Sequence, residues 1–289
     1  MQHGPAVRRR KLGAELRALR TGAGLTSGEA ARLAGWHQSK VSRIETGASG
    51  VKPADVRLLL DVYEVRDGQL RELLLVLAGS DEGGGRHHWW HQYRGVLPTT
   101  YRDFISLESQ ASAMRTLETS VVPGLLQTPE YARAVTRAAV GGLDADTDDR
   151  LDALVEVRLA RQDVLRAQPP LELSAVLDEA VLRREIGGPA TMARQLRRLI
   201  EAARLPQVRL QVLPFAAGAH IGITGPFVIF SFPSTSDLDV VVLDHMTSSL
   251  YLERKEDLQA YTEAFNTLQI HALSPEDSLD YIAGIGDGA

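Results

Sequence analysis

The chain contains no cysteine, which excludes disulfide bonds and thiolate metal sites. Only four of its 32 basic residues are lysine, and this preference for arginine is typical of a GC-rich genome. No apolar run is long enough to cross a bilayer, and the first residues lack the apolar core of a signal peptide. We therefore expect a cytoplasmic protein with no membrane contact.

Charge is distributed unevenly along the 289 residues. Residues 1–80 hold 13 Lys and Arg against 8 Asp and Glu, a balance of +5, although the whole chain carries −5. The remaining residues therefore carry −10. Because association with nucleic acid is steered by the local charge rather than the overall charge, this balance is compatible with DNA binding by the N-terminal part.

Residues 25–47 have the spacing of a helix-turn-helix. Thr26 or Ser27 can cap the first helix, and Glu29 stands three residues after Thr26, in the capping-box position. Gly35 is placed to make the turn, because glycine adopts the left-handed backbone conformation without strain. The alternative without a DNA-binding role is an ordinary helical hairpin with a solvated polar face.

The second helix is expected to begin near His37 and to bury Val41 and Ile44. Arginine, glutamine and serine are side chains that bond base edges in the major groove. We therefore predict that the outward residues of this helix read bases, namely Gln38, Ser39, Ser42 and Arg43. Phosphate contacts are predicted for Thr26, Ser27, Lys40 and Lys52.

This segment resembles the xenobiotic-response-element type of helix-turn-helix found in the Cro and phage-repressor family. The resemblance is carried by the sequence GWHQSKVSRIETG, from Gly35 to Gly47. It differs from the family pattern at His37, where serine is the usual cap, and at Ser27, where glutamine is frequent. The resemblance implies double-stranded DNA as a partner.

The length predicts two domains. We expect a five-helix DNA-binding domain at residues 1–79, a glycine-rich linker at 80–88, and a second domain at 89–289. The second domain combines helical segments with short strands rich in branched residues, which predicts an α+β fold with a mostly antiparallel sheet. Helices are expected at about 99–120, 129–139, 146–166, 189–204 and 254–272. Strands are expected at 171–177, 208–213, 227–232, 238–243 and 249–252.

No known catalytic spacing occurs in the second domain, so we expect no enzyme, no catalytic residue, no cofactor and no metal. His87 and His91 could face one metal ion from a helix, but an amphipathic helix that docks its tryptophans explains them better. Asp178 and Glu179 are expected to cap a helix. Residues with aromatic or polar side chains beside turns could instead form a ligand or partner site: Trp89, Trp90, Gln127, Phe215 and His220.

The second domain resembles the C-terminal domain of a large actinobacterial group of antitoxin-like helix-turn-helix regulators. The resemblance is carried by Leu107-Glu108 with Ala111, VPGLLQTPEYA at 122–132, RLARQ at 158–162, LDEAVLRREIGG at 177–188, VLPFAAGAHIGITGPF at 212–227 and ALSPEDSL at 272–279. It implies a transcription regulator of differentiation or secondary metabolism, with a small acidic partner protein encoded by a neighbouring gene.

From these observations we predict a homodimeric, sequence-specific DNA-binding transcription regulator. Its second domain would dimerise, bind a partner or sense an unknown small-molecule effector. The alternative is an antitoxin-like protein that neutralises a small partner protein and binds DNA only to regulate its own operon.

Overall fold

A computed structural model describes residues 4–78, 90, 93, 95–140, 147–232, 239–245 and 248–287. The expected linker at 80–88 lies outside these residues, as do Trp89 and the pair His87 and His91. The domain boundaries placed there therefore stay a prediction. None of the described helices is both long and apolar enough to cross a membrane.

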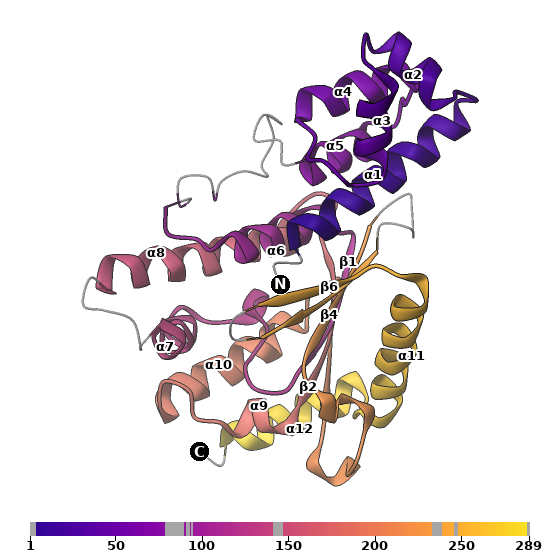
Figure 1. Ribbon diagram of the computed structural model, residues 1–289. Helices are drawn as coiled ribbons and strands as arrows, with labels where there is room; N and C mark the ends of the chain where they lie inside the picture. Colours follow the sequence, from indigo (N-terminus) through magenta and orange to yellow (C-terminus); the bar gives the residue numbers. More distant parts are fainter. Residues whose placement is uncertain are drawn as a thin grey trace.

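Residues 4–77 form five helices, as the sequence predicts, and pack as one helical region (Figure 1). Their buried stripe contains Leu12 and Leu16 of the first helix and Leu59 and Leu74 of the last two. The helices are α1 (Gly4–Gly22), α2 (Ser27–Leu33), α3 (Gln38–Glu45), α4 (Pro53–Val62) and α5 (Gly68–Leu77). We call this region the head.

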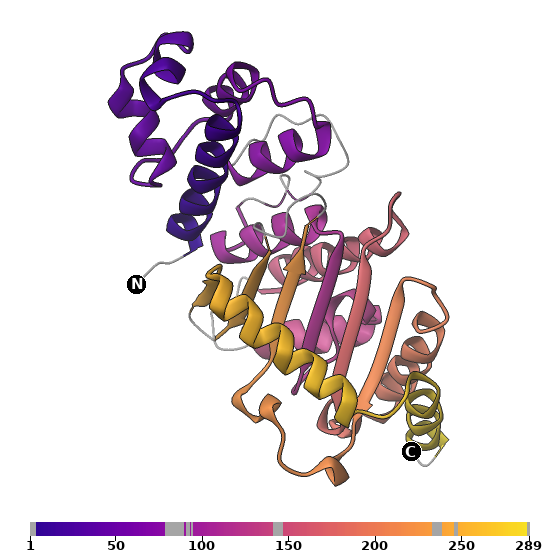
Figure 2. The same ribbon diagram turned by 90° about the vertical axis from the view of Figure 1, so that its right-hand side faces the viewer.

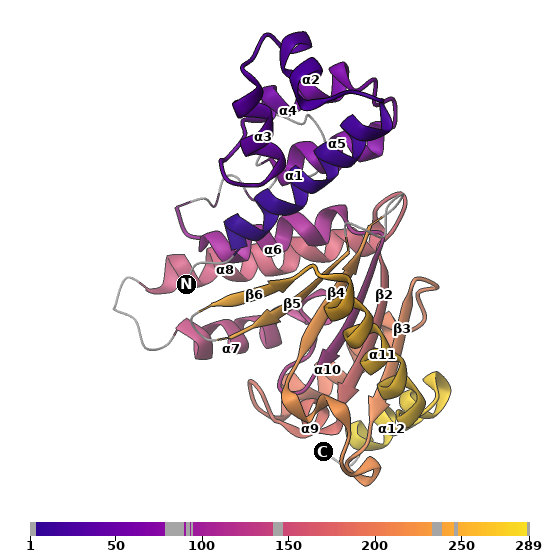
Figure 3. The ribbon, with the colours of Figure 1, turned by 45° about the vertical axis from the view of Figure 1, so that its right-hand side comes forward.

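The rest of the described chain, here called the body, is built on a six-stranded sheet of order β3-β2-β1-β4-β5-β6 (Figure 3). Its pairings β1–β4, β4–β5 and β5–β6 are antiparallel, while β1–β2 and β2–β3 are parallel. The α+β class with a mostly antiparallel sheet is thus confirmed. The strands are β1 (Ala113–Glu118), β2 (Glu172–Asp178), β3 (Val208–Leu213), β4 (Phe227–Ser231), β5 (Val240–Asp244) and β6 (Ser249–Leu252).

The central strand β1 corrects the sequence-based prediction, which made residues 99–120 one helix. Helix α6 (Thr99–Gln110) ends earlier, and the following residues AMRTLE form β1. This hexapeptide consists largely of good helix formers, and it lacks the polar and apolar alternation of a half-exposed strand. Because β1 lies between β2 and β4 with both faces covered, its pairing partners override its local helix preference.

Helices cover both faces of the sheet (Figures 1 and 2). On one face lie α6, α7 (Pro129–Val140), α8 (Thr147–Ala160) and α10 (Pro189–Ala202), and on the other lies α11 (Lys255–His271). Short helices connect these elements, and α12 (Pro275–Asp287) packs against β3 and α10. The short helices are η2 (Gly124–Leu126), η3 (Arg161–Arg166), α9 (Glu179–Arg183), η4 (Phe215–Ala217) and η5 (Ile221–Thr224).

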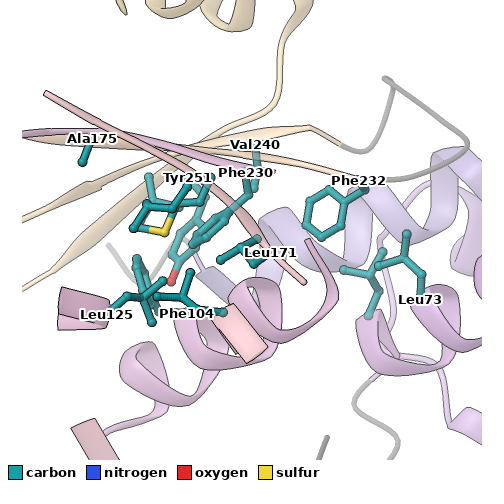
Figure 4. Packing of buried hydrophobic residues seen from close by; sticks show 14 of the residues in the cluster. Leu73, Phe104, Leu125, Leu171, Ala175, Phe230, Phe232, Val240 and Tyr251 are labelled. Atoms are coloured by element: carbon teal, nitrogen blue, oxygen red, sulfur yellow. The ribbon is translucent and has the colours of Figure 1, made fainter. Parts of the chain in front are cut away.

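The main apolar core fills the space between the sheet and the α6 side (Figure 4). At its centre the rings of Phe104 and Phe230 meet edge to face, with centroids 5.2 Å apart. The same cluster continues into the head, where Leu73 of α5 faces Phe232 (Figure 4). Helix α1 also contacts the edge strand β6. The head therefore packs against the body through apolar side chains.

Candidate nucleic-acid interface and a buried charge cluster

The first helix of the predicted pair, α2, begins with the expected capping box. The Thr26 hydroxyl accepts the Glu29 N–H at 3.2 Å, and the Glu29 carboxylate accepts the Thr26 N–H at 2.8 Å. The hydrogen bonds that the Glu29 carboxylate accepts from the Thr26 N–H and from the Thr26 hydroxyl lower the pKa of Glu29. Gly35 has φ of +69°, the left-handed conformation that the turn between α2 and α3 requires.

Helix α3 has the two faces that its sequence predicts. Val41 and Ile44 are buried, with exposed fractions of 0% and 2%. The four predicted base-reading residues, Gln38, Ser39, Ser42 and Arg43, are all exposed. The N-cap is His37, whose Nδ1 accepts the Ser39 N–H at 3.3 Å, so the histidine replaces the usual serine in that role. Gln38 donates from Nε2 to the Ser27 hydroxyl at 3.0 Å and thereby joins α3 to α2.

A buried ion pair that sequence reasoning missed holds the end of α3. Arg20 Nε and Nη2 donate to the two oxygens of Glu45 at 2.7 and 3.0 Å, and Nη1 donates to the Leu25 carbonyl at 2.6 Å. This hydrogen bonding raises the pKa of Arg20. The pair orients α3 on α1 and on the loop before α2. Glu45 stands within the family motif, and that position was the available clue.

The four residues predicted to contact phosphate lie in different surroundings. Lys40 is already engaged, because its Nζ lies 3.1 Å from Asp55 and 3.6 Å from the centroid of the Trp36 ring. Lys52 is exposed directly before α4. The Thr26 hydroxyl belongs to the capping box, and Ser27 accepts from Gln38. All four phosphate contacts stay predictions. Of the four side chains, that of Lys52 is the least engaged with other protein groups.

The structure separates the residues predicted to form one ligand or partner site in the body. Trp90 is buried against Ile105 and Val157. Gln127 is also buried, and its Nε2 donates to the Val122 carbonyl at 2.7 Å on the α6 side of the sheet. Phe215 is 58% exposed. His220 instead belongs to the segment that packs under α11, so the sheet lies between it and Gln127.

His220 lies beside Asp178, with Nε2 3.8 Å from the carboxylate. Its Nδ1 is buried, has no hydrogen-bond partner among the described residues, and packs closely on Gly222. Asp178 caps α9 by accepting the Ala180 N–H at 2.8 Å, which confirms its predicted structural role. Glu179 accepts the Phe215 N–H at 2.8 Å; burial alone would raise the pKa of Glu179, but this bond and Arg183 lower it.

The body also contains a charge cluster between α6, β1 and the end of α8, which sequence reasoning did not assemble. We call it the Arg158 cluster; its members are Tyr101, Glu108, Glu118, Gln127, Arg158 and Arg161. At its inner end Arg161 donates to the two oxygens of Glu108 at 2.8 and 2.6 Å and to the Tyr101 hydroxyl at 2.9 Å. Burial alone would lower the pKa of Arg161, but Glu108 and Tyr101 outweigh it and leave that pKa raised.

At the outer end of the cluster, Glu118 and Arg158 are half-buried. Burial raises the pKa of Glu118 to about 8; Asp244 adds to the rise, while the Thr116 hydroxyl, Arg158 and Arg161 oppose it. Burial also lowers the pKa of Arg158. Arg158 donates to the Gln127 Oε1 at 3.3 Å. Within the described residues, this cluster included, no group of three or more His, Asp or Glu could hold a metal ion.

The capped helix pair and its left-handed turn define a helix-turn-helix protein, and residues 11–74 match the family model of a helix-turn-helix domain. Residues 101–284 match the model of a domain of unknown function, DUF5753. Because this match covers more than half of the chain, the protein belongs to the DUF5753 family. No curated protein and no solved structure matches the chain.

Proposed function

We propose that the protein is a cytoplasmic, sequence-specific DNA-binding transcription regulator. The observation that carries the proposal is the exposed face of α3, where Gln38, Ser39, Ser42 and Arg43 lie opposite the buried Val41 and Ile44. A recognition helix presents side chains of these types to base edges in the major groove. The net positive charge of residues 1–80 favours the approach to DNA.

The protein would bind DNA as a homodimer. One recognition helix covers a half-site only, so the operator should be an inverted repeat whose half-site centres are about 34 Å apart or a multiple of that. The body would hold the two copies together and receive the regulatory signal. Footprinting on DNA selected from the source genome measures the repeat, and a single unrepeated site bound by a monomer would refute the dimer.

The base-reading role of Arg43 is tested by gel shifts on the selected operator. Arg43→Ala should weaken binding by about 1–3 kcal/mol and relax the preference at one base pair. Lys52→Ala should weaken binding to all sequences alike and reduce the salt dependence, as expected for a phosphate contact. Arg66→Ala is the matched control, because Arg66 is exposed in the turn between α4 and α5. Unchanged affinity in Arg43→Ala would contradict the groove assignment.

The second candidate is an antitoxin-like protein that binds a small acidic partner encoded nearby. One surface favours it: Phe215, Ile221 and Ile223 are 58%, 55% and 69% exposed in neighbouring short helices. Clustered exposed apolar side chains are a common mark of protein contacts, whereas ones scattered singly are normal. If the product of the neighbouring gene co-purifies with the chain and Ile223→Asp releases it, the result supports the antitoxin-like function rather than regulation by a small molecule.

A further inference from the structure

The outer end of the Arg158 cluster lies where the strands of one sheet edge terminate. Glu118 is the last residue of β1, and Asp244 is the last of β5. The strand register pairs Leu117 with Phe227 and Val228 with Val242. Extended toward the ends of β1 and β5, this register places Glu118 and Asp244 in one row, with the β4 side of the sheet between them. Ligands of open sheets flanked by helices commonly bind beyond the carboxyl ends of strands, at the point where the strand order reverses. In the order β3-β2-β1-β4-β5-β6 that point lies between β1 and β4.

Exposure rises along the cluster from the inside outward. Arg161 and Glu108 are 6% and 1% exposed, Glu118 and Arg158 are half-buried, and Asp244 is exposed. The cluster is therefore a polar path from the solvent to a buried ion pair. Burial of charges costs several kcal/mol in desolvation, and an apolar core of the same volume would be at least as stable.

Arg158 has donors left over. A guanidinium carries five N–H groups, and within the described residues this one makes a single hydrogen bond, the 3.3 Å contact with Gln127. Among the described residues, no carboxylate lies within ion-pair distance of Arg158. The neighbouring Arg161 differs, because Glu108 and Tyr101 already accept from its donors. The half-buried Arg158 thus has N–H groups available to a further acceptor.

The charge of the cluster indicates which acceptor fits. With a pKa of about 8, Glu118 is mostly protonated at neutral pH and can itself donate a hydrogen bond. Among the buried and half-buried groups, Arg158 and Arg161 then face one carboxylate, Glu108, which leaves one positive charge uncompensated there. Asp244 at the outer end repels a second negative charge. The arrangement favours a group with a single negative charge over a dianion such as phosphate.

We propose that the Arg158 cluster binds a small molecule through one carboxylate group, which accepts hydrogen bonds from the Arg158 guanidinium and from Glu118. The assignment rests on the proposed function only in naming this molecule an effector of DNA binding.

The cluster is connected to the head through two elements. Tyr101 is the cluster residue nearest the start of α6, and Thr100 directly precedes it. The hydroxyl of Tyr251 on β6 donates to the carbonyl of Thr100 at 3.3 Å. Strand β6 contacts α1 of the head. A ligand that binds differently to two positions of α6 would therefore change how the head is held.

The experiment measures binding to the full-length protein without DNA. Benzoate, propionate and inorganic phosphate are titrated at equal ionic strength, with the melting temperature and tryptophan fluorescence as readouts. We expect benzoate and propionate, but not phosphate, to raise the melting temperature. Arg158→Gln should weaken binding about tenfold or more, since it removes a charge-assisted hydrogen bond. Arg150→Gln, an exposed position on the same helix, is the control and should bind as the wild type does.

The variants separate a binding site from a folding defect. If Arg158→Gln unfolds, Glu118→Gln replaces it, since the amide keeps a donor and should retain benzoate binding at pH above 8, where the wild type loses it. Equal binding in Arg158→Gln and Arg150→Gln, or no carboxylate response in the wild type, would overturn the proposal. Gel shifts with benzoate then test the effector role separately, so that failure to bind DNA leaves the site assignment standing.

Discussion

The head and the body each contain an arginine that donates to both oxygens of a buried glutamate, and the two pairs have different consequences. In the head, each guanidinium nitrogen of Arg20 donates to a protein group, the Tyr63 hydroxyl also donates to Glu45 at 3.5 Å, and the predicted base-reading residues lie outside on α3. In the body, Arg161 and Glu108 form the closed end of a larger cluster. A second arginine, Arg158, continues it toward the solvent.

This difference distinguishes positioning from binding. A pair in which every guanidinium nitrogen bonds a protein group orients the elements that carry it, as Arg20 and Glu45 orient α3. A cluster of buried and half-buried charges that includes a guanidinium with unused donors carries a desolvation cost, and stabilising the fold does not explain that cost. The head thus exposes the residues predicted to contact DNA, whereas the candidate site of the body is partly buried.

Breaking either pair should produce the largest effects. Glu108→Ala leaves the buried Arg161 without its carboxylate and should lower the free energy of unfolding by about 3–5 kcal/mol. Glu45→Ala should lower it by less, because Arg20 is only partly buried. Urea denaturation measures the loss, with Glu72→Ala on the exposed face of α5 as the control. A loss within the range of the control would show that neither pair holds its region together.

The contact between α1 and α3 is tested at Gly13. A Cβ there would lie 2.4 Å from the Ile44 carbonyl oxygen and 2.7 Å from that of Glu45, and both are backbone atoms that cannot move independently. Gly13→Ala should destabilise the head by about 1–3 kcal/mol. Gly22→Ala in the same helix meets no atom within 4 Å and should leave stability unchanged or raise it slightly. Equal thermal unfolding of the two variants would contradict this packing.

The pH dependence of stability probes the outer end of the Arg158 cluster. Because folding raises the pKa of Glu118 to about 8, the folded state holds its proton longer than the unfolded state. Stability relative to Glu118→Gln should therefore fall as the pH rises from the ordinary range of a glutamate toward 8, and then level off. We expect a difference of about 1–2 kcal/mol, since Glu118 keeps part of its surface in water.

Urea denaturation of both proteins at about pH 5, 7 and 9 provides this measurement. The groups that face Glu118 are Thr116, Arg158, Arg161 and Asp244, and they are unchanged in the variant. Glu156→Gln, exposed on α8, should show no such dependence. A stability difference that stayed constant over this range would mean that Glu118 ionises normally.

The smallest effect is expected at the cap of α2. Thr26→Ala removes the acceptor of the Glu29 N–H and should cost about 1 kcal/mol, while Thr26→Ser should keep the cap. Hydrogen exchange of the α2 amides would localise the loss to the head. An equal loss across the body would show that the two regions unfold together.

Much of the head could be predicted because its determinants are local. The capping box joins residues three apart, Gly35 makes its turn alone, and Val41 and Ile44 lie one helical turn apart. Five helices and an outward polar face follow from such short spacings. The Arg20–Glu45 pair escaped prediction because it joins residues 25 positions apart.

In the body, sequence alone determined the fold class and most strands, since branched residues between turns mark them locally. Only the tertiary structure decided that residues 113–118 form the central strand, because neighbours on both sides override a helix-favouring hexapeptide. The same holds for the Arg158 cluster, whose members come from α6, β1, the turn after η2, α8 and η3. A site built from groups distant in sequence has no spacing to read, because only the packing of helices on the sheet brings its charges together.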